Sequence, residues 1–262
     1  MNVLLCVVGM VVGVTQLHDV VYVVCYKSST IRRYNATTHE RLTGIDVKNL
    51  TRPHDIATCQ QTSKLYVADW GAWEACVWRV SSDSEDIKRC WTPSPSDEFR
   101  PWTLSVTSSR VLVTSLDSRQ LMQLDAGGDE LRRVHLPDDM YPWHAVESQT
   151  NGKFIVSHLN RQLEHGQVSE VNSAGHVLRR FSPGLSLGLP VHFAVDSQGN
   201  IFVADFDNGR ILLLDAQLTL RRVIIDEHQL NYKPPRHLCY NEQSVQLVVT
   251  LSGGSIAVFA VV

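Results

Sequence analysis

The residues best suited to chemistry in this sequence follow five prolines at related positions. The pairs that follow them are His54-Asp55, Trp102-Thr103, Trp143-His144, Val191-His192 and Arg236-His237. Aromatic, arginine and histidine side chains give large contact energies at a low entropic cost, so a convergent set of them suits a binding site. We therefore predict a binding site made of Arg52, His54, Trp102, Trp143, His144, His192, Arg236 and His237.

Metal chemistry has less support from the same positions. Catalytic zinc needs three converging protein ligands, and His54 is the only histidine directly after a proline. His144, His192 and His237 come one residue later, and a shift of one residue turns a strand side chain to the opposite face. Asp55 is the only carboxylate among these residues, which argues against a calcium site. We expect no metal and no cofactor.

The six cysteines carry no metal or redox motif. No pair has the CxxC spacing, and most lie in apolar runs, which is typical of buried free thiols in a reducing compartment. We expect a cytoplasmic protein. Secretion is the alternative, because residues 3–14 are apolar over the length of a signal-peptide core and two glycosylation sequons begin at Asn35 and Asn49. That run lacks a preceding basic residue and a cleavage site, and it is too short for a membrane span.

Composition excludes several function classes. The chain has 262 residues, of which 44% are hydrophobic and 19% are charged, so it is globular. A net charge of -3 supplies no general attraction for nucleic acid or an acidic membrane. We expect no DNA partner, and an RNA partner would need a local basic patch.

The five prolines mark an internal repeat. Prolines 53, 101, 142, 190 and 235 lie 48, 41, 48 and 45 residues apart, and each begins an apolar strand that is followed by a second one. A second repeat occurs at the end of each unit, as in Leu131-Arg132-Arg133-Val134 and Leu220-Arg221-Arg222-Val223. Four short strands in about 45 residues, without helical periodicity, are typical of a propeller blade. We predict an all-β, six-bladed propeller of four-stranded antiparallel blades over residues 1–262, with blades near 11–49, 50–91, 100–137, 141–182, 189–227 and 234–262.

The ends of the chain indicate how the ring closes. The sixth unit stops one strand short, while residues 3–8 form a spare apolar strand before the first unit. A ring closed by this strand would remove two open sheet edges. The same fold places the residues after the prolines at the mouth of the central channel. They bind a partner there, or they only plug the channel.

The arginine doublets lie on the outermost strand of each predicted blade. Charged residues on such an edge prevent strands of different molecules from pairing. The doublets are also spread around the rim, too far apart to follow one phosphate backbone. We therefore place the binding site at the channel mouth rather than at the rim.

Residues 190–210 resemble an NHL repeat almost throughout, and Arg52 to Asp69 is a second good match. The other blades depart from the pattern, since Cys25, Ser115, His158 and Leu251 stand where Asp69 and Asp205 stand. The resemblance implies the propeller found in tripartite-motif ubiquitin ligases, which binds protein substrate or RNA. The chain has no zinc-ligand array for a RING domain. It would therefore be a monomeric, non-catalytic recognition domain for a protein partner, with RNA as the alternative.

Two enzyme families also resemble this fold. Peptide-amidating lyases bind zinc through histidines placed directly after the blade prolines, where only His54 matches here. Enzymes of the gluconolactonase type need carboxylate and asparagine ligands for calcium on the channel. Neither set of ligands is complete, so we expect that the chain is not an enzyme.

Overall fold

Apolar runs such as residues 65–68 form buried strands, because β-branched and aromatic side chains fit a pleated sheet. The computed structural model describes residues 2–6, 9–71, 74–107, 109–148, 152–160, 165–181 and 187–261, and within 2–6 it describes the backbone only. These ranges contain strands and turns but no helix, and so no helix there is long and apolar enough to cross a membrane. The fold is all-β, as predicted.

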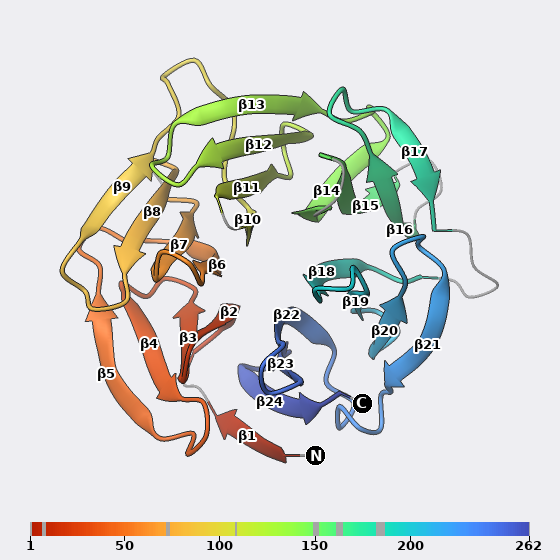
Figure 1. Cartoon of the computed structure of the whole chain (residues 1–262). Helices are drawn as coiled ribbons and strands as arrows, with labels where there is room; N and C mark the ends of the chain where they lie inside the picture. Colours follow the sequence, from red (N-terminus) through yellow and green to blue (C-terminus); the bar gives the residue numbers. More distant parts are fainter. Residues whose placement is uncertain are drawn as a thin grey trace.

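Six antiparallel sheets of four strands stand around a central channel, which confirms the predicted propeller (Figure 1). The first three blades are β2 (Val11–Leu17), β3 (Val20–Cys25), β4 (Thr30–Asn35) and β5 (Arg41–Asp46); β6 (Pro53–Cys59), β7 (Lys64–Asp69), β8 (Cys76–Ser81) and β9 (Ile87–Trp91); and β10 (Thr103–Val106), β11 (Arg110–Ser115), β12 (Gln120–Asp125) and β13 (Glu130–His135). In each blade the first strand lies at the channel and the last at the rim.

The other three blades follow the same order. They are β14 (Met140–Glu147), β15 (Phe154–Asn160), β16 (His165–Val171) and β17 (Val177–Arg180); β18 (Pro190–Val195), β19 (Ile201–Asp205), β20 (Arg210–Leu214) and β21 (Leu220–Ile225); and β22 (Pro235–Asn241), β23 (Gln246–Leu251), β24 (Ser255–Ala260) and β1 (Asn2–Cys6). The N-terminal strand is therefore the rim strand of the sixth blade, and it pairs antiparallel with β24. This confirms the predicted closure, although residues 7 and 8 of the predicted strand lie outside the described residues.

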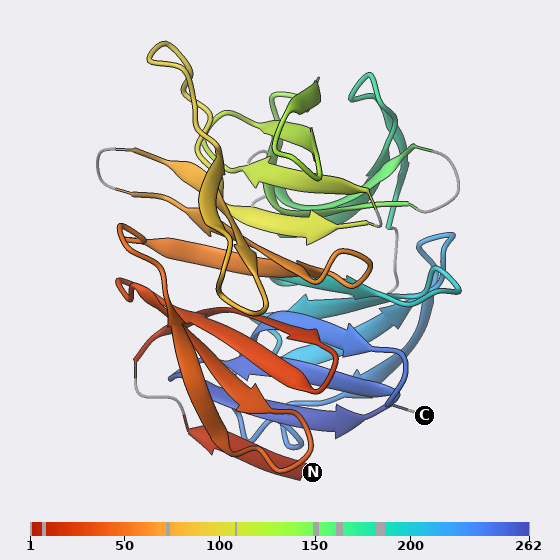
Figure 2. The same ribbon diagram turned by 60° about the vertical axis from the view of Figure 1, so that its left-hand side comes forward.

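The core is divided among the contacts between neighbouring blades. Among the described residues there are six hydrophobic clusters, and each joins two adjacent blades, the sixth and first included. Figure 2 shows the blades packed face to face. Because each blade buries both faces of its sheet, the ring holds the channel-lining strands in fixed positions.

A buried aspartate holds the entrance to the second blade. Asp69 is 1% exposed, and its carboxylate accepts hydrogen bonds from the backbone N–H groups of Thr51 and Arg52 and from the indole of Trp78. Asp205 does the same in the fifth blade, where it accepts from the Gly188 N–H. These bonds fix the segment that leads each inner strand into the channel.

Deletion of residues 1–9 should lower the melting temperature by about 5 °C or more, because it exposes the edge of β24 and removes the bonds that close the ring. Differential scanning calorimetry measures the melting temperature. The control is a protein with an added N-terminal tag and an intact β1, which should keep the wild-type value. An unchanged melting temperature would show that β1 does not close the ring.

Candidate functional site

A β-bulge at the start of most inner strands sets the direction of the candidate residues. In β6, for example, Pro53 pairs with Asp69 and Asp55 with Ala68, so His54 is an extra residue that the partner strand does not match. The same irregularity occurs in β2, β14, β18 and β22. A bulge turns consecutive side chains in different directions. The residue one after the proline therefore faces the mouth, and the residue two after it enters the channel.

The mouth carries a group of aromatic rings, here called the mouth cluster: Tyr26, His54, Trp70, Trp102 and Trp143. The His54 ring lies 4.2 Å from Trp102, and Trp102 lies 6.0 Å from Trp143. All five side chains are half-buried, so the cluster is packed beneath but open to solvent. Burial lowers the pKa of His54 to about 4, assisted by the nearby His237, so His54 is neutral at physiological pH.

Below the mouth, one residue from each blade forms a ring that we call the belt. Its members are Gly13, Asp55, Thr103, His144, His192 and His237. Gly13 lets the first blade approach closely here, because a Cβ at this position would lie 2.8 Å from the Ile56 nitrogen. The side chains of Asp55 and His192 meet although they come from opposite blades, so the belt fills the channel at this level.

The Asp55 carboxylate is the centre of the belt. It is 1% exposed and accepts hydrogen bonds of 2.8 Å from the N–H groups of Ile56 and Leu104. His192 Nε2 and His237 Nδ1 each lie 3.5 Å from one of its oxygens. Burial alone would raise the pKa of Asp55, but the contacts with the two histidines outweigh it and hold that pKa well below its usual range. The carboxylate is therefore a buried anion.

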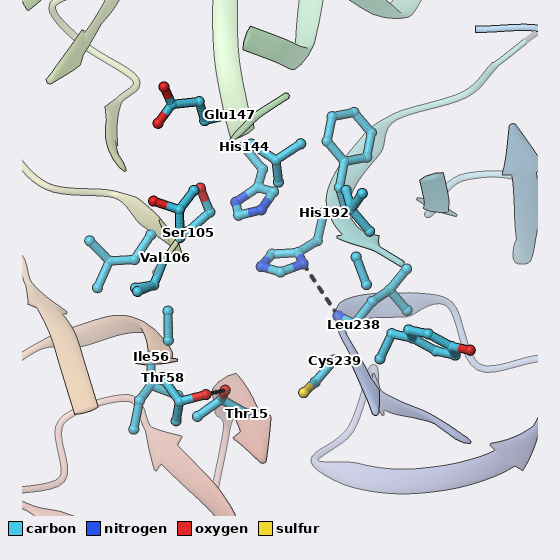
Figure 3. Close-up of a pocket in the computed structure, with 18 of the residues that line it drawn as sticks. Thr15, Ile56, Thr58, Ser105, Val106, His144, Glu147, His192, Leu238 and Cys239 are labelled. Carbon is cyan, nitrogen blue, oxygen red and sulfur yellow. Dashed lines mark hydrogen bonds between the residues drawn. The ribbon is translucent and has the colours of Figure 1, made fainter. Parts of the chain in front are cut away.

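Hydrogen bonding assigns the proton positions on the histidines. The Leu238 N–H donates to His192 Nδ1 at 3.3 Å, the dashed line in Figure 3. The ring proton of His192 must then be on Nε2, which faces Asp55. His144 stacks on His192 with ring centres 3.8 Å apart, and burial lowers the pKa of His144 well below its usual value. Burial also lowers the pKa of His237, although Asp55 opposes that shift.

Asp55, His192 and His237 are close enough together to be tested as a metal site, since their ligand atoms lie within 4.8 Å of one another. The geometry does not fit a metal ion. His192 Nε2 carries the ring proton, and a ligand nitrogen must be unprotonated. Two backbone N–H groups also occupy lone pairs of the carboxylate, and the two histidine nitrogens lie 3.5 Å from its oxygens. The absence of a metal therefore stays a prediction, and it now rests on these contacts.

Beyond the belt, toward the turns that join the first and second strands of the blades, lies a cavity of about 880 Å³ that we call the chamber (Figure 3). His144 and His192 line it next to the belt. The residue four after each proline, or its counterpart in the first blade, is small in every blade. These residues are Thr15, Ala57, Ser105, Val146, Ala194 and Cys239, and all of them line the chamber. The channel is thus wide here because its wall is made of small side chains.

The eight predicted site residues fall into two groups. Arg52, His54, Trp102, Trp143 and Arg236 lie at the mouth, and their role in binding stays a prediction. His144, His192 and His237 were also expected there, but they lie deeper, in the belt, because the bulge turns them into the channel. They differ from His54 in direction, as the shift of one residue predicts, and Asp55 shares their position in the repeat. Trp70 was also missed, although it directly follows Asp69.

The chain matches no protein-family model and no curated protein sequence. Solved structures share its fold. A virginiamycin B lyase from Staphylococcus aureus, in a catalytically inactive variant with one histidine replaced by alanine and with quinupristin, is 11% identical; the match covers 96% of this chain and 80% of that one at a TM-score of 0.69. A nidogen/laminin complex gives 13% identity, coverage of 87% and 84%, and a TM-score of 0.68. A Bacteroides thetaiotaomicron protein of unknown function is 13% identical; the match covers 97% of this chain and 70% of that one at a TM-score of 0.77.

These matches show the fold and correct one expectation. The expectation that the chain is not an enzyme is contradicted, because streptogramin-type lyases are built on the same fold over nearly the whole of this chain. The incomplete zinc and calcium ligand sets therefore do not exclude an enzyme. A propeller that binds protein also agrees with the neighbours, since a nidogen/laminin complex is among them.

Replacing Asp55 with asparagine should reduce the free energy of unfolding by about 3–5 kcal/mol, because the belt histidines and two backbone N–H groups lose their anion. Thr103→Val is the matched control in the same ring. It removes one hydrogen bond, to the Trp143 carbonyl, and should cost about 1 kcal/mol. Urea unfolding measures both. Equal losses would show that the Asp55 charge is not the centre of the belt.

Acid should destabilise the protein in two steps. His144 stays neutral when folded but takes up a proton when unfolded, so stability falls by about 1.4 kcal/mol per pH unit as the pH drops below 6.5, and the lowered pKa of His237 adds to this loss. Asp55 adds stability above its unfolded pKa of 3.8, and that contribution is lost below it. Urea unfolding from pH 7.5 to 4 measures the first step. A flat profile between pH 6.5 and 5 would contradict the burial of neutral histidines.

Proposed function

We propose that the protein recognises an acidic segment of a protein partner on its mouth face. The observation that supports this is the mouth cluster, in which three tryptophans and a histidine are packed beneath and open above. Rigid aromatic rings of this kind lose little entropy on binding and commonly carry most of a partner's binding energy.

Arginines around the mouth cluster favour a partner that carries negative charge. The Arg100 guanidinium lies 5.5 Å from the Trp70 ring centre, and that of Arg236 lies 5.0 Å from Phe206. Stacking holds these side chains in place, and a planar guanidinium suits a carboxylate. The backbone of Arg52 lies beside that of Trp70, since the Arg52 carbonyl accepts a hydrogen bond from the Trp70 N–H. The neighbouring charges favour aspartate or glutamate in the partner.

The rim arginines support a protein partner rather than RNA. Arg179 contacts Glu170 at 3.3 Å, and Arg133 pairs with Asp97 and Glu130. Guanidinium groups already held by carboxylates are poorly placed to collect phosphates. The likeness of residues 190–210 to an NHL repeat adds support, because such propellers hold the substrate in tripartite-motif ubiquitin ligases.

Selection of displayed random peptides on the intact protein tests this proposal. Selected peptides should be enriched in aspartate and glutamate. Trp143→Ala and Arg236→Ala should each weaken their binding by about 2 kcal/mol, or roughly 30-fold, while the melting temperature changes little. Fluorescence anisotropy gives the dissociation constants. The matched control is Arg179→Ala with Arg180→Ala at the rim, which should not change them. Loss of peptide binding in the rim variant would show that the recognition surface lies on the outer strands and not at the mouth.

One observation favours a second function on the same protein, acid–base catalysis. Asp55 faces Nδ1 of His237, the arrangement in which a buried aspartate orients a catalytic histidine. His237 is neutral at pH 7 and 14% exposed, so its Nε2 is left to take a proton from a bound molecule. The reaction class would be proton abstraction, which agrees with the presence of lyases among structures of this fold.

Quinupristin is the first compound to test, because it accompanies the lyase in the solved structure. Its loss on incubation with the protein, followed by liquid chromatography, should fall at least 100-fold in His237→Gln. Arg179→Ala is the control and should keep the full rate. If the protein leaves quinupristin unchanged, this class of compound is not its substrate. Equal rates of quinupristin loss in the His237→Gln and Arg179→Ala variants would exclude His237 as the base.

A further inference from the structure

The chamber is a second recessed site, separate from the mouth face. Its wall includes Ser105, whose hydroxyl is buried without a hydrogen-bond partner, and His144, whose Nδ1 is also without one. His144 is only 1% exposed. Buried polar atoms are nearly always satisfied in folded proteins. Both atoms are covered while the chamber is empty, so a bound molecule would satisfy them through a rotation of the Ser105 hydroxyl and of the His144 ring.

The charge of the wall limits the kind of molecule. Arg110 and Glu147 are the only charged side chains that line the chamber among the described residues, and they pair with each other at 3.0 Å. Glu147 also accepts a hydrogen bond from Gln123. Burial keeps His144 neutral. The wall thus offers no unpaired charge to an ionic ligand, and a buried ion without a partner would be costly.

The rest of the wall includes residues with hydroxyl groups and residues with hydrocarbon side chains. The hydroxyls come from Thr15, Thr58, Ser105, Thr107, Ser109, Ser148 and Tyr240. The Thr58 hydroxyl donates to the Gln16 carbonyl and shares a hydrogen bond of 3.0 Å with Thr15, so both hydroxyls keep only acceptor capacity for a ligand. Apolar wall is supplied by residues such as Leu104, Val106 and Phe193. A volume of about 880 Å³ is within the range of small-molecule sites.

We propose that the chamber binds an uncharged small molecule with hydroxyl or carbonyl oxygens on an apolar framework, held against His144 and Ser105. The belt separates this molecule from the mouth face, because Asp55, His192 and His237 fill the channel between them. The proposal is therefore independent of the partner assigned to the mouth.

Saturation-transfer NMR on the intact protein tests this with cyclohexanediols, lactams and methyl pyranosides. Matched probes carry a carboxylate or an ammonium group on the same rings. The uncharged probes should bind at least 10-fold more tightly than the charged ones. Equal binding of both sets, or no binding of any uncharged probe at 1 mM, would overturn the proposal.

Two further measurements locate the bound probe. Ser105→Phe narrows the chamber without breaking a hydrogen bond and should weaken binding at least 10-fold, whereas Ser244→Phe on an exposed turn should not. Trp143→Ala should leave the probes bound, which separates this site from the mouth. In the wild-type protein, labelled-histidine spectra should show the His144 signal moving on probe addition while exposed His176 stays fixed. Binding that leaves the His144 signal unmoved would place the probe elsewhere.

Discussion

The centre of this propeller depends on one buried carboxylate. Asp55 lies on the second blade, accepts a hydrogen bond from the third and contacts histidines of the fifth and sixth. A charge this deeply buried is tolerated only when donors surround it. The inner strands must therefore keep their spacing, because a small outward movement of any one blade would leave the anion under-coordinated. The interactions at the centre thus restrain a ring whose hydrophobic cores lie farther out, between the blades.

The belt also divides the channel into two compartments of different chemistry. On one side are partly exposed tryptophans with stacked arginines, which suit a protein segment. On the other is a cavity whose charged side chains are paired and whose wall includes a ring of small side chains, which suits a small molecule. The division follows from the bulges, since they place large residues one position after the prolines and polar residues two positions after. One short sequence motif, repeated around the ring, therefore supplies both surfaces.

Much of the fold could be predicted because its signals are local and repeated. The prolines at 53, 101, 142, 190 and 235 fixed the blade period, and the incomplete sixth unit pointed to the N-terminal strand as its missing edge. The mouth residues followed from the same period. The depth of His144, His192 and His237 could not be read in this way, because an ideal strand pattern takes no account of a bulge.

The contacts across the ring could not be predicted from the sequence for another reason. Asp55 and His237 are separated by most of the chain, and no local pattern links them. The chamber arises from the absence of large side chains at residues such as Ala57, Ser105 and Ala194, and small residues attract little notice in a sequence read for reactive groups. A comparison of the fourth residue after each proline would have revealed that ring.

The pairing of β1 with β24 constrains the order in which the molecule can be made. β1 is synthesised before the other strands of the propeller, but its partner strand, Ser255–Ala260, is synthesised after all of them. The first strand must therefore wait, unpaired, while the blades between them form. Among the strand pairings of the described residues, this one closes the largest loop, and it is expected to be slow. Until it forms, β24 presents an open edge to other nascent chains, so ring closure is the step at which assembly and aggregation compete.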